Sequence, residues 1–512
     1  MYRTLTALSV LTPLALASQA SNGLNYAISA LKSTNYGTGL GSTCACGLLD
    51  LVLGPQKVLF PNSTAYTAQA THYYSTRMDL SPKCVFVPAS ANDVATGVVI
   101  LDVCKSQFAI RSAGHMSILG AANTDGGVLV ALSSFANVTL SADKSTVDVG
   151  PAANWYQVNE VLYPAGLMAI GGRLKTIGVG GLTLGGGIHY FTAKYGFAMD
   201  NVAAYEVVIA SGEVVIANAT SNPDLFWALK GGGNNFGIVT KMTLLTHPAP
   251  QISSSLLIYG PTTGQQFVSA IADFATYQTE LENGLETGGI FVIDYAASTG
   301  MSPMLMGVQI SDELQPAIFE NFTSIPSEIA VYNITNLADW GAEFDTPYQQ
   351  ARWMYGMHSM VVDNSSMQEM YSIYEDAVTE MDSINGFTVT LTYQPLPSTA
   401  FAVSANNGVG NTWAHPDNQN YVFWLLSTSW ADAADDETVM TWAETTREKM
   451  HANNIAKGTG LELLYMNDSA DDQDPIGSFP NASISRLQSI RQEYDPNFVF
   501  TNLVTGGFKL PN

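Results

Sequence analysis

Three blocks of glycine between residues 171 and 237 limit what this chain can fold into more than any other feature. They read Gly178-Val-Gly-Gly181, Gly185-Gly-Gly187 and Gly231-Gly-Gly233, and apolar, strand-like runs separate them. Glycine lets a backbone approach a ligand closely, because it has no Cβ atom. One such block alone favours a tight turn in a β-rich domain. Three in order, behind Arg111-Ser-Ala-Gly-His115, instead indicate loops wrapped around a large, flat, phosphate-bearing cofactor.

The charge of the chain limits the kinds of partner that it can bind. Its 512 residues are enough for two or three domains, and 46% apolar with 12% charged residues is typical of a packed globular protein. The formal net charge is −24. Because affinity for nucleic acid and for anionic membranes comes largely from Lys and Arg, we expect neither as a partner.

The N-terminus favours export. Residues 1–20 read as a signal peptide, with Arg3, an apolar run over 5–16 and small residues before the cleavage site. No later apolar run is long enough to cross a membrane, so we expect a secreted, extracellular protein. Eight Asn-x-Ser/Thr sequons are compatible with a glycoprotein. They begin at Asn62, Asn137, Asn218, Asn321, Asn333, Asn364, Asn467 and Asn481.

All four cysteines, Cys44, Cys46, Cys84 and Cys104, fall in one early segment. In an oxidising compartment an even number suggests up to two disulfides, with three possible pairings. The spacing of Cys44-Ala-Cys46 does not suit a zinc knuckle, and no histidine cluster accompanies it. We therefore expect no metal.

The pattern of apolar residues predicts an α+β chain. A strand over 84–88, a helix over 94–104 and a strand over 108–110 form a β-α-β unit that places Arg111–His115 at a strand end, where α/β domains bind ligands. Glycine thins after Ser255, and strands alternate with helices, which indicates a large antiparallel sheet. Outside this unit we predict strands over 57–60, 128–132, 138–140, 146–149, 204–210, 214–217, 238–246, 289–295, 388–393, 421–430 and 462–465, and helices over 24–31, 155–163, 224–229, 367–381 and 484–494.

Several motifs combine into a recognisable set. They are Arg111-Ser-Ala-Gly-His115, Gly178–Gly181, Leu184–Gly187, Tyr195-Gly196, Asp200-Asn201, Gly231–Gly237 and Tyr494-Asp-Pro-Asn-Phe-Val-Phe500. Together they resemble the berberine-bridge-enzyme-like flavoproteins of the vanillyl-alcohol-oxidase superfamily, secreted fungal members above all. The resemblance covers nearly all of the chain after residue 20.

The resemblance implies a fold and a division into domains. The fold would be α+β, with a two-lobed PCMH-type FAD-binding domain over 21–250 and its core over about 78–249. A substrate-binding domain, a large antiparallel sheet flanked by helices, would follow over 251–483. A C-terminal segment, 484–512, would return to the FAD domain. A monomer is expected.

The resemblance also implies the cofactor and its contacts. His115 matches the histidine that bonds covalently to FAD, and Ile177 matches a position that gates oxygen access. Leu174 stands where many relatives carry a second, cysteinyl attachment, so we expect a single bond. The remaining expected cofactor contacts are Arg111, Ser112, Ala113, Gly114, Met116, Gly178, Gly180, Gly181, Gly185, Gly186, Gly187, Gly237, Ile238 and Val239.

The catalytic base departs from the family pattern. Relatives often carry Tyr-x-Asn-Tyr, whose last tyrosine helps to deprotonate the substrate, but here Asp468 replaces it in Tyr465-Met-Asn-Asp468. The candidate bases are Asp468 and Tyr465, since a carboxylate in an apolar pocket can act near neutral pH. By resemblance, Gln394 hydrogen-bonds the substrate. The alternatives are a surface turn at Asp468 and a proline-bounded strand end at Gln394.

Three functions remain open. The first is a secreted FAD-dependent oxidoreductase that abstracts a hydride from a small organic substrate, such as a secondary metabolite, and passes electrons to O₂ or another acceptor. The second is an oligosaccharide oxidase that produces hydrogen peroxide. The third is a non-redox flavin-bearing protein or a cyclase. The sequence does not name the substrate, because the motif match is weakest in the domain expected to bind it.

Overall fold

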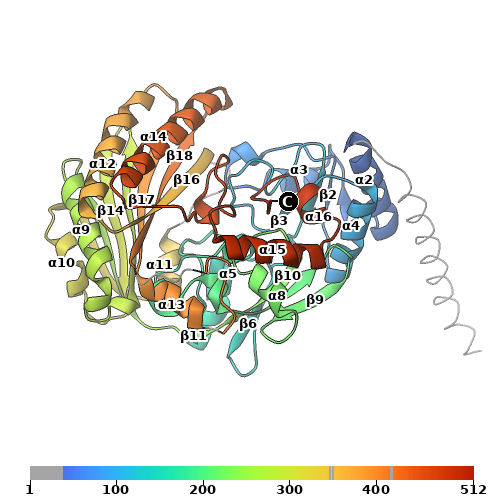
Figure 1. The fold of residues 1–512 in the computed structure, drawn as a ribbon, viewed down its shortest axis with the longest axis horizontal. Coiled ribbons are helices and arrows are strands. Elements are labelled where there is room, and N and C mark those ends of the chain that lie inside the picture. The colour runs from blue at the N-terminus through green and yellow to red at the C-terminus, as the bar shows by residue number, and fades with distance from the viewer. Residues whose placement is uncertain (1–37, 345–347, 349–350, 407, 415–418, 512) are drawn as a thin grey trace, which may run out of the picture.

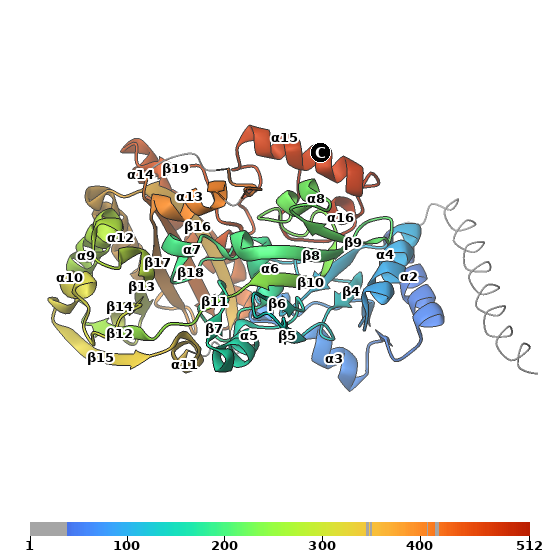
Figure 2. The same ribbon diagram turned by 90° about the horizontal axis from the view of Figure 1, so that it is seen from below.

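The computed structural model describes residues 38–344, 348, 351–406, 408–414 and 419–511. The expected signal segment 1–20 and the predicted helix over 24–31 lie outside these ranges. Figures 1 and 2 show a large sheet with helices on its outer side, beside a second half that holds a four-stranded and a five-stranded sheet. This arrangement confirms the α+β prediction.

The first small sheet has the strand order β1-β2-β4-β3. Its strands are β1 (Val58–Leu59), β2 (Cys84–Phe86), β3 (Phe108–Arg111) and β4 (Val128–Ala131). Helix α4 (Ala91–Cys104) joins β2 to β3, and Ser90 caps it by accepting from the N–H of Asp93. Both β2 and β3 run parallel to β4, which lies between them. The predicted β-α-β unit is therefore confirmed, with a third strand inserted into it.

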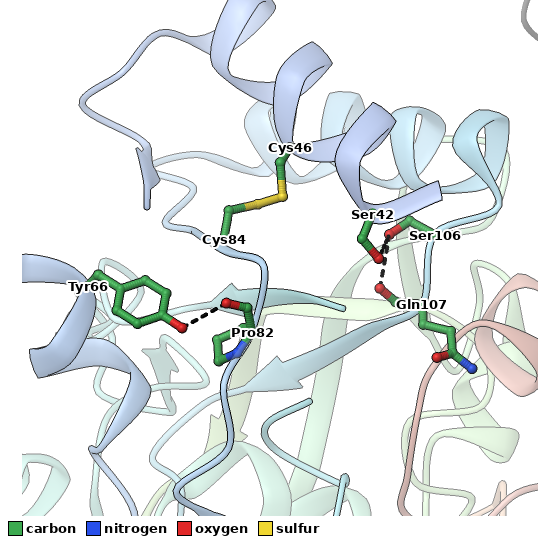
Figure 3. Close-up of a disulfide and its surroundings, with 7 residues drawn as sticks. All are labelled: Ser42, Cys46, Tyr66, Pro82, Cys84, Ser106 and Gln107. Atoms are coloured by element: carbon green, nitrogen blue, oxygen red, sulfur yellow. Dashed lines mark hydrogen bonds between the residues drawn. A yellow bond between two sulfur atoms is a disulfide. The ribbon is translucent and has the colours of Figure 1, made fainter. Parts of the chain in front are cut away.

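Two disulfides fasten helix α2 (Thr38–Leu53), which the sequence did not predict, to this sheet. Cys44 pairs with Cys104 at the end of α4, and Cys46 pairs with Cys84 on β2. Figure 3 shows the second bridge, with the Ser42 and Ser106 hydroxyls 3.3 Å apart nearby. The expected disulfides are confirmed, and the pairing left open by the sequence is resolved.

The second small sheet is antiparallel, in the order β5-β6-β10-β8-β9. Its strands are β5 (Val138–Leu140), β6 (Thr146–Val149), β8 (Val202–Val208), β9 (Val214–Asn218) and β10 (Ile238–Leu245). The predicted turn between β8 and β9 has Gly212 at φ 82°, a conformation that favours glycine. Short helix α6 (Val179–Leu184) begins at Gly178, in the first glycine block.

The large sheet has eight antiparallel strands in the order β15-β12-β14-β13-β17-β18-β16-β19. Helices α9 (Gly264–Tyr277), α12 (Asn364–Val378) and α14 (Asp436–Ala456) cover one face (Figures 1 and 2). The strands are β12 (Ile252–Tyr259), β13 (Thr287–Ala296), β14 (Gly300–Gln309), β15 (Ser327–Thr335), β16 (Arg352–Val361), β17 (Thr388–Leu396), β18 (Tyr421–Trp430) and β19 (Gly460–Leu461).

Alternation along β17 decides which side chains face inward. Val389, Leu391 and Tyr393 belong to the core beneath the helices. Because successive strand residues point to opposite faces, Thr390, Thr392 and Gln394 are turned to the other face, where they line a cavity. The strand's own sequence thus places Gln394 in the cavity.

One predicted strand is wrong. Residues 462–465 are irregular, and a 3₁₀ turn, η9 (Met466–Asp468), follows them. All of 463–466 are buried, so the run has no alternating solvent face, and its N–H groups bind outside a ladder: that of Leu464 donates to Ser478 Oγ at 2.9 Å. This irregular path brings Tyr465 and Asp468 to the cavity.

The end of the chain returns to the half with the small sheets (Figure 1). Helix α15 (Asn481–Tyr494) lies against α8 (Pro223–Ala228). After α16 (Val499–Asn502), the carbonyl of Leu503 accepts from the N–H of Phe108 at the start of β3. Residues 507 and 508 then reach the wall of the cavity.

Candidate functional site

A cavity of about 490 Å³ lies between the large sheet and the two small ones. Its walls combine the loop after β3, the first glycine block, the start of β10, the inner face of the large sheet and the turn around η9. Most of its lining is apolar, and a few polar groups converge in it, as is usual for small-molecule sites.

The loop after β3 offers main-chain donors to this cavity. Within the described residues, the N–H groups of residues 113–116 find no hydrogen-bond acceptor. A Cβ on Gly114 would lie 2.5 Å from the carbonyl oxygen of His72, and its φ of 80° favours glycine. Opposite the loop, a Cβ on Gly181 would meet no atom within 4 Å. Free N–H groups beside open space form a concavity suited to an anionic group such as a phosphate.

His115 presents its imidazole to the same cavity. The ring stacks on Tyr74, with centroids 4.3 Å apart and planes 11° apart. Its Nε2 atom is buried and, among the described residues, lacks a hydrogen-bond partner. Burial lowers the pKa of His115 to about 4, so the ring is neutral at physiological pH and keeps a lone pair available for bonding.

Tyr465 is held by the second glycine block. Its hydroxyl oxygen accepts from the N–H of Gly187 at 3.2 Å and from Asn467 Nδ2 at 2.9 Å. A Cβ on Gly186 would lie 2.6 Å from Trp413 and 3.1 Å from Tyr465, so glycine lets these rings close in. Burial raises the pKa of Tyr465 above its usual value. The phenol therefore stays neutral, which weakens it as a base.

Asp468 is the carboxyl of the site, and its side chain is partly buried. Gln394 Nε2 donates to its Oδ2 at 2.8 Å, and Arg173 Nη2 donates to Gln394 Oε1 at 2.5 Å. Burial raises the pKa of Asp468 to about 6, against the smaller lowering effects of Gln394 and the charge of Arg173. Such a group is mostly ionised at neutral pH and still basic enough to take a proton.

Comparison with known proteins identifies the family. The FAD binding domain family model matches residues 82–218. The chain is 33% identical over 474 residues to the FAD-dependent monooxygenase prx3 of Penicillium roqueforti. The aligned region covers 90% of this chain and 92% of that protein. The chain belongs to the berberine-bridge-enzyme-like family of FAD-linked oxidoreductases. It is an enzyme, and FAD is its cofactor.

The chain is also similar to a second relative in sequence and to a solved structure in fold. The bifunctional solanapyrone synthase of Alternaria solani is 29% identical over 494 residues, covering 96% of this chain and 93% of that protein. The xylooligosaccharide oxidase of Myceliophthora thermophila C1, solved in complex with xylobiose, superposes with a TM-score of 0.74 at 19% identity, over 92% of this chain and all of that chain. The second likeness confirms the expected PCMH-type fold.

The described residues fit FAD in this oxidoreductase. The free N–H groups of the loop after β3 suit its pyrophosphate, and His115 lines the same cavity. Most of the expected cofactor contacts line the cavity. They are Ser112, Ala113, Gly114, His115, Met116, Ile177, Gly178, Gly180, Gly181, Gly185, Gly237, Ile238 and Val239.

Three expected cofactor contacts lie outside the cavity wall. Gly186 and Gly187 are next to Tyr465 instead. Arg111 is buried, and its guanidinium donates to the main-chain and side-chain oxygens of Gln69 and lies 5.7 Å over the ring of Tyr73. Arg111 therefore fixes the back of the loop.

The expected single attachment agrees with the cysteines. Leu174 lines the cavity at the position of the second attachment, and all four cysteines of the chain are in disulfides near α2. No thiol is left for a cysteinyl bond. Among the described residues, no cluster of His, Cys, Asp or Glu could hold a metal ion, and none of the helices is long and apolar enough to cross a membrane.

Sequence reasoning missed part of the cavity wall. Tyr74, Arg173, Trp353 and Tyr355 line the cavity, and Thr390, Thr392 and Ser427 extend its polar strip along β17 and β18. The period-2 pattern of these strands could have grouped the side chains that share a face. Nothing local in the sequence indicates which face is inward, or that the loop holding Arg173 meets β17.

Proposed function

We propose that this oxidoreductase is secreted, carries FAD covalently on His115 and removes a hydride from a small organic substrate. One observation carries the proposal: the cavity that His115 lines also holds Asp468, a partly buried carboxyl with a pKa of about 6. Family members named as monooxygenases and as solanapyrone synthase support a role in secondary-metabolite tailoring. The acceptor of the electrons would be O₂ or another oxidant.

Each residue has a separate task in this proposal. FAD supplies the hydride acceptor. Asp468 takes the proton that leaves the substrate, and Gln394 fixes the orientation of the carboxyl through its 2.8 Å hydrogen bond. Tyr465, a neutral phenol next to Asp468, positions substrate instead of acting as the base. Residues 112–116 and the glycines of the first block hold the cofactor.

The two smaller sheets would form the FAD-binding domain over residues 21–250, and the large sheet the substrate domain over 251–483, with 484–512 closing back onto the first. We infer a monomer. The largely apolar lining of the cavity favours a compact, hydrophobic substrate over an oligosaccharide, which needs many polar partners for its hydroxyls. An oligosaccharide oxidase remains the second candidate, because a xylooligosaccharide oxidase shares the fold.

The test is anaerobic bleaching of the flavin absorbance by two panels, one of aromatic and polyketide-like alcohols and phenols, the other of oligosaccharides. We expect stoichiometric bleaching by members of the first panel only. Asp468→Asn should slow bleaching strongly, while the matched change at the exposed Asp312, Asp312→Asn, should not. A substrate that is cyclised while the flavin stays oxidised would instead establish the non-redox function.

A further inference from the structure

Arg173 is a cation in the cavity wall, and no carboxylate of the described residues lies within contact distance of it. Its Nη2 donates to Gln394 Oε1 at 2.5 Å, its Nη1 to the carbonyl of Gly289 at 3.4 Å, and the guanidinium lies 6.0 Å over the ring of Tyr190. Among the described residues it makes no ion pair within 4 Å. A guanidinium has five N–H donors, so it keeps some of them for a ligand.

Gln394 couples this cation to Asp468. A guanidinium only donates hydrogen bonds and an ionised carboxylate only accepts them, so the amide must turn its oxygen to Arg173 and its nitrogen to Asp468, as observed. The positive and the negative charge therefore lie on one wall of the cavity with one amide between them. Each can still bind a group that enters the cavity.

No other charged side chain among the described lining residues competes with this pair. Among the described lining residues, Arg173 and Asp468 are the only Arg, Lys, Asp or Glu. His115 and the nearby His189 are neutral, because burial lowers their pKa values to about 4 and about 3. Burial also keeps the tyrosines of the wall neutral, by raising the pKa of Tyr74, Tyr355 and Tyr465. The surrounding wall is apolar, with Leu174, Ile290, Val292, Met306 and Leu425 in it.

We propose that Arg173 and Gln394 form a subsite for a negatively charged oxygen on an otherwise hydrocarbon substrate: a phenolate, an enolate or a carboxylate. This inference rests on the proposed function, since it names the substrate class of the same cavity. It makes Arg173 a binding residue that reads the substrate's charge.

The charges balance during the reaction. With Asp468 ionised, the pair is neutral, and a phenol or enol substrate enters with its O–H intact, whereas a carboxylate enters already ionised. The proton passes from that O–H to the carboxylate, and the negative charge moves from Asp468 to the substrate oxygen, where Arg173 still compensates it. Loss of the hydride from carbon to FAD then raises the bond order at that oxygen. The net charge of the cavity wall and substrate stays constant until the hydride leaves.

Isothermal titration calorimetry of the purified holoprotein tests this without turnover. Two pairs of ligands are compared. Benzoate and its neutral analogue benzamide form the carboxylate arm, and 4-nitrophenolate and its neutral analogue 4-nitroanisole form the phenolate arm. We expect the anion in at least one arm to bind about tenfold or more tighter than its neutral partner, as a charge-assisted hydrogen bond provides. At pH 7 the binding of benzoate, which is already ionised in solution, should take up close to one proton, measured with buffers of different ionisation enthalpy, because a second negative charge raises the pKa of Asp468. At pH 5 the uptake should vanish. The phenolate arm is run at a pH at which 4-nitrophenol is ionised and serves for the affinity comparison alone.

Variants localise the effect. Arg173→Met should abolish the preference for the anion, Arg173→Lys should retain part of it, and Lys175→Met is the matched control, because Lys175 lies over Tyr156 outside the cavity. Equal binding of anion and neutral partner to the unaltered protein, absence of binding by all four, or a preference that survives in Arg173→Met overturns the subsite. Flavin bleaching by a neutral substrate, unchanged in Arg173→Met, would do the same and leave the proposed function standing.

Discussion

Two opposing effects set the pKa of the Asp468 carboxyl. Burial disfavours its charged form, whereas the hydrogen bond from Gln394 and the charge of Arg173 favour it. Burial wins in part, and the pKa settles at about 6. At Tyr465, only three residues away, burial outweighs the lowering effects of Asn467, Arg173 and Gly187, raises the pKa and leaves a neutral phenol. We therefore propose Asp468, and not a tyrosine, as the base of this enzyme.

This pKa gives a pH profile. Asp468 must be ionised to accept a proton, so kcat/KM for flavin reduction should be level above about pH 6 and fall about tenfold per unit below it. Asp468→Asn should reduce the rate by about 10²–10⁴ and remove the acid limb. Stopped-flow reduction under anaerobic conditions measures both. An unchanged acid limb in Asp468→Asn would assign the base to another group.

Ile177 sets a second expectation at this scale. It lines the cavity close to Gly172, and it carries one more methylene than valine. Interiors are close-packed and adjust little, so a difference of that size can decide whether O₂ reaches the flavin. We expect slow reoxidation of the photoreduced protein by O₂, faster reaction with a quinone, and a gain for O₂ in Ile177→Val. Fast reoxidation that the substitution leaves unchanged would show that no gate operates here.

At the scale of elements, local sequence patterns predicted well which helices and strands form, but they predicted poorly where these elements lie in the fold. The β-α-β unit around α4, the hairpin at Gly212 and strand β17 follow from capping, turn residues and alternation in their own sequences. Helix α2 is not predicted, because no polar face marks it, although Gly54 with φ 90° and Pro55 mark its C-terminal end. The apolar residues 463–465 favour a strand, but tertiary contacts of Leu464 override that propensity. Which residues meet in the cavity depends on loop closure between distant elements, and Arg173 with Gln394, 221 positions apart, is the clearest case.

Helix α2 is held by its two disulfides and by apolar packing of Ala45 and Leu49, and the disulfides give a stability prediction. The bridges close segments of 60 and 38 residues, for which chain entropy gives about 4 kcal/mol each. Replacing Cys46 and Cys84 by alanine should lower the free energy of unfolding by up to that amount, measured by denaturant titration, with little effect on flavin content, because α2 is remote from the cavity. Native protein with four titratable thiols would contradict the pairing.

At the scale of the whole molecule, the cavity exists because the chain passes twice between its halves. The large sheet supplies Gln394, and the stretch after β19 supplies Asp468 before the chain returns to the small sheets through α15. Arg77, near the loop after β3, is paired with Asp471, and Arg447 on α14 with Asp472, so the turn that carries Asp468 is tied to both halves. Separate expression of either half should therefore fail to assemble the site.

The fold also determines which asparagines of the glycosylation sequons are exposed. Six of the eight asparagines are exposed, namely Asn62, Asn137, Asn321, Asn333, Asn364 and Asn481. Asn467 instead lines the cavity and donates to the carbonyl of Leu182 and to the hydroxyl of Tyr465. In protein secreted from a fungal host, glycopeptide mass spectrometry should find glycans at some of the six and none at Asn467. A fully occupied Asn467 would be incompatible with this cavity.

The attachment of FAD to His115 is the central claim, and acid denaturation tests it most directly. We expect the yellow colour to remain with the precipitated protein, and a proteolytic peptide spanning His115 to carry the mass of one flavin. His115→Ala should still bind FAD through the N–H groups of residues 113–116, but acid should release it. Free FAD in the supernatant of the unaltered protein, with an unmodified His115 peptide, would contradict the account.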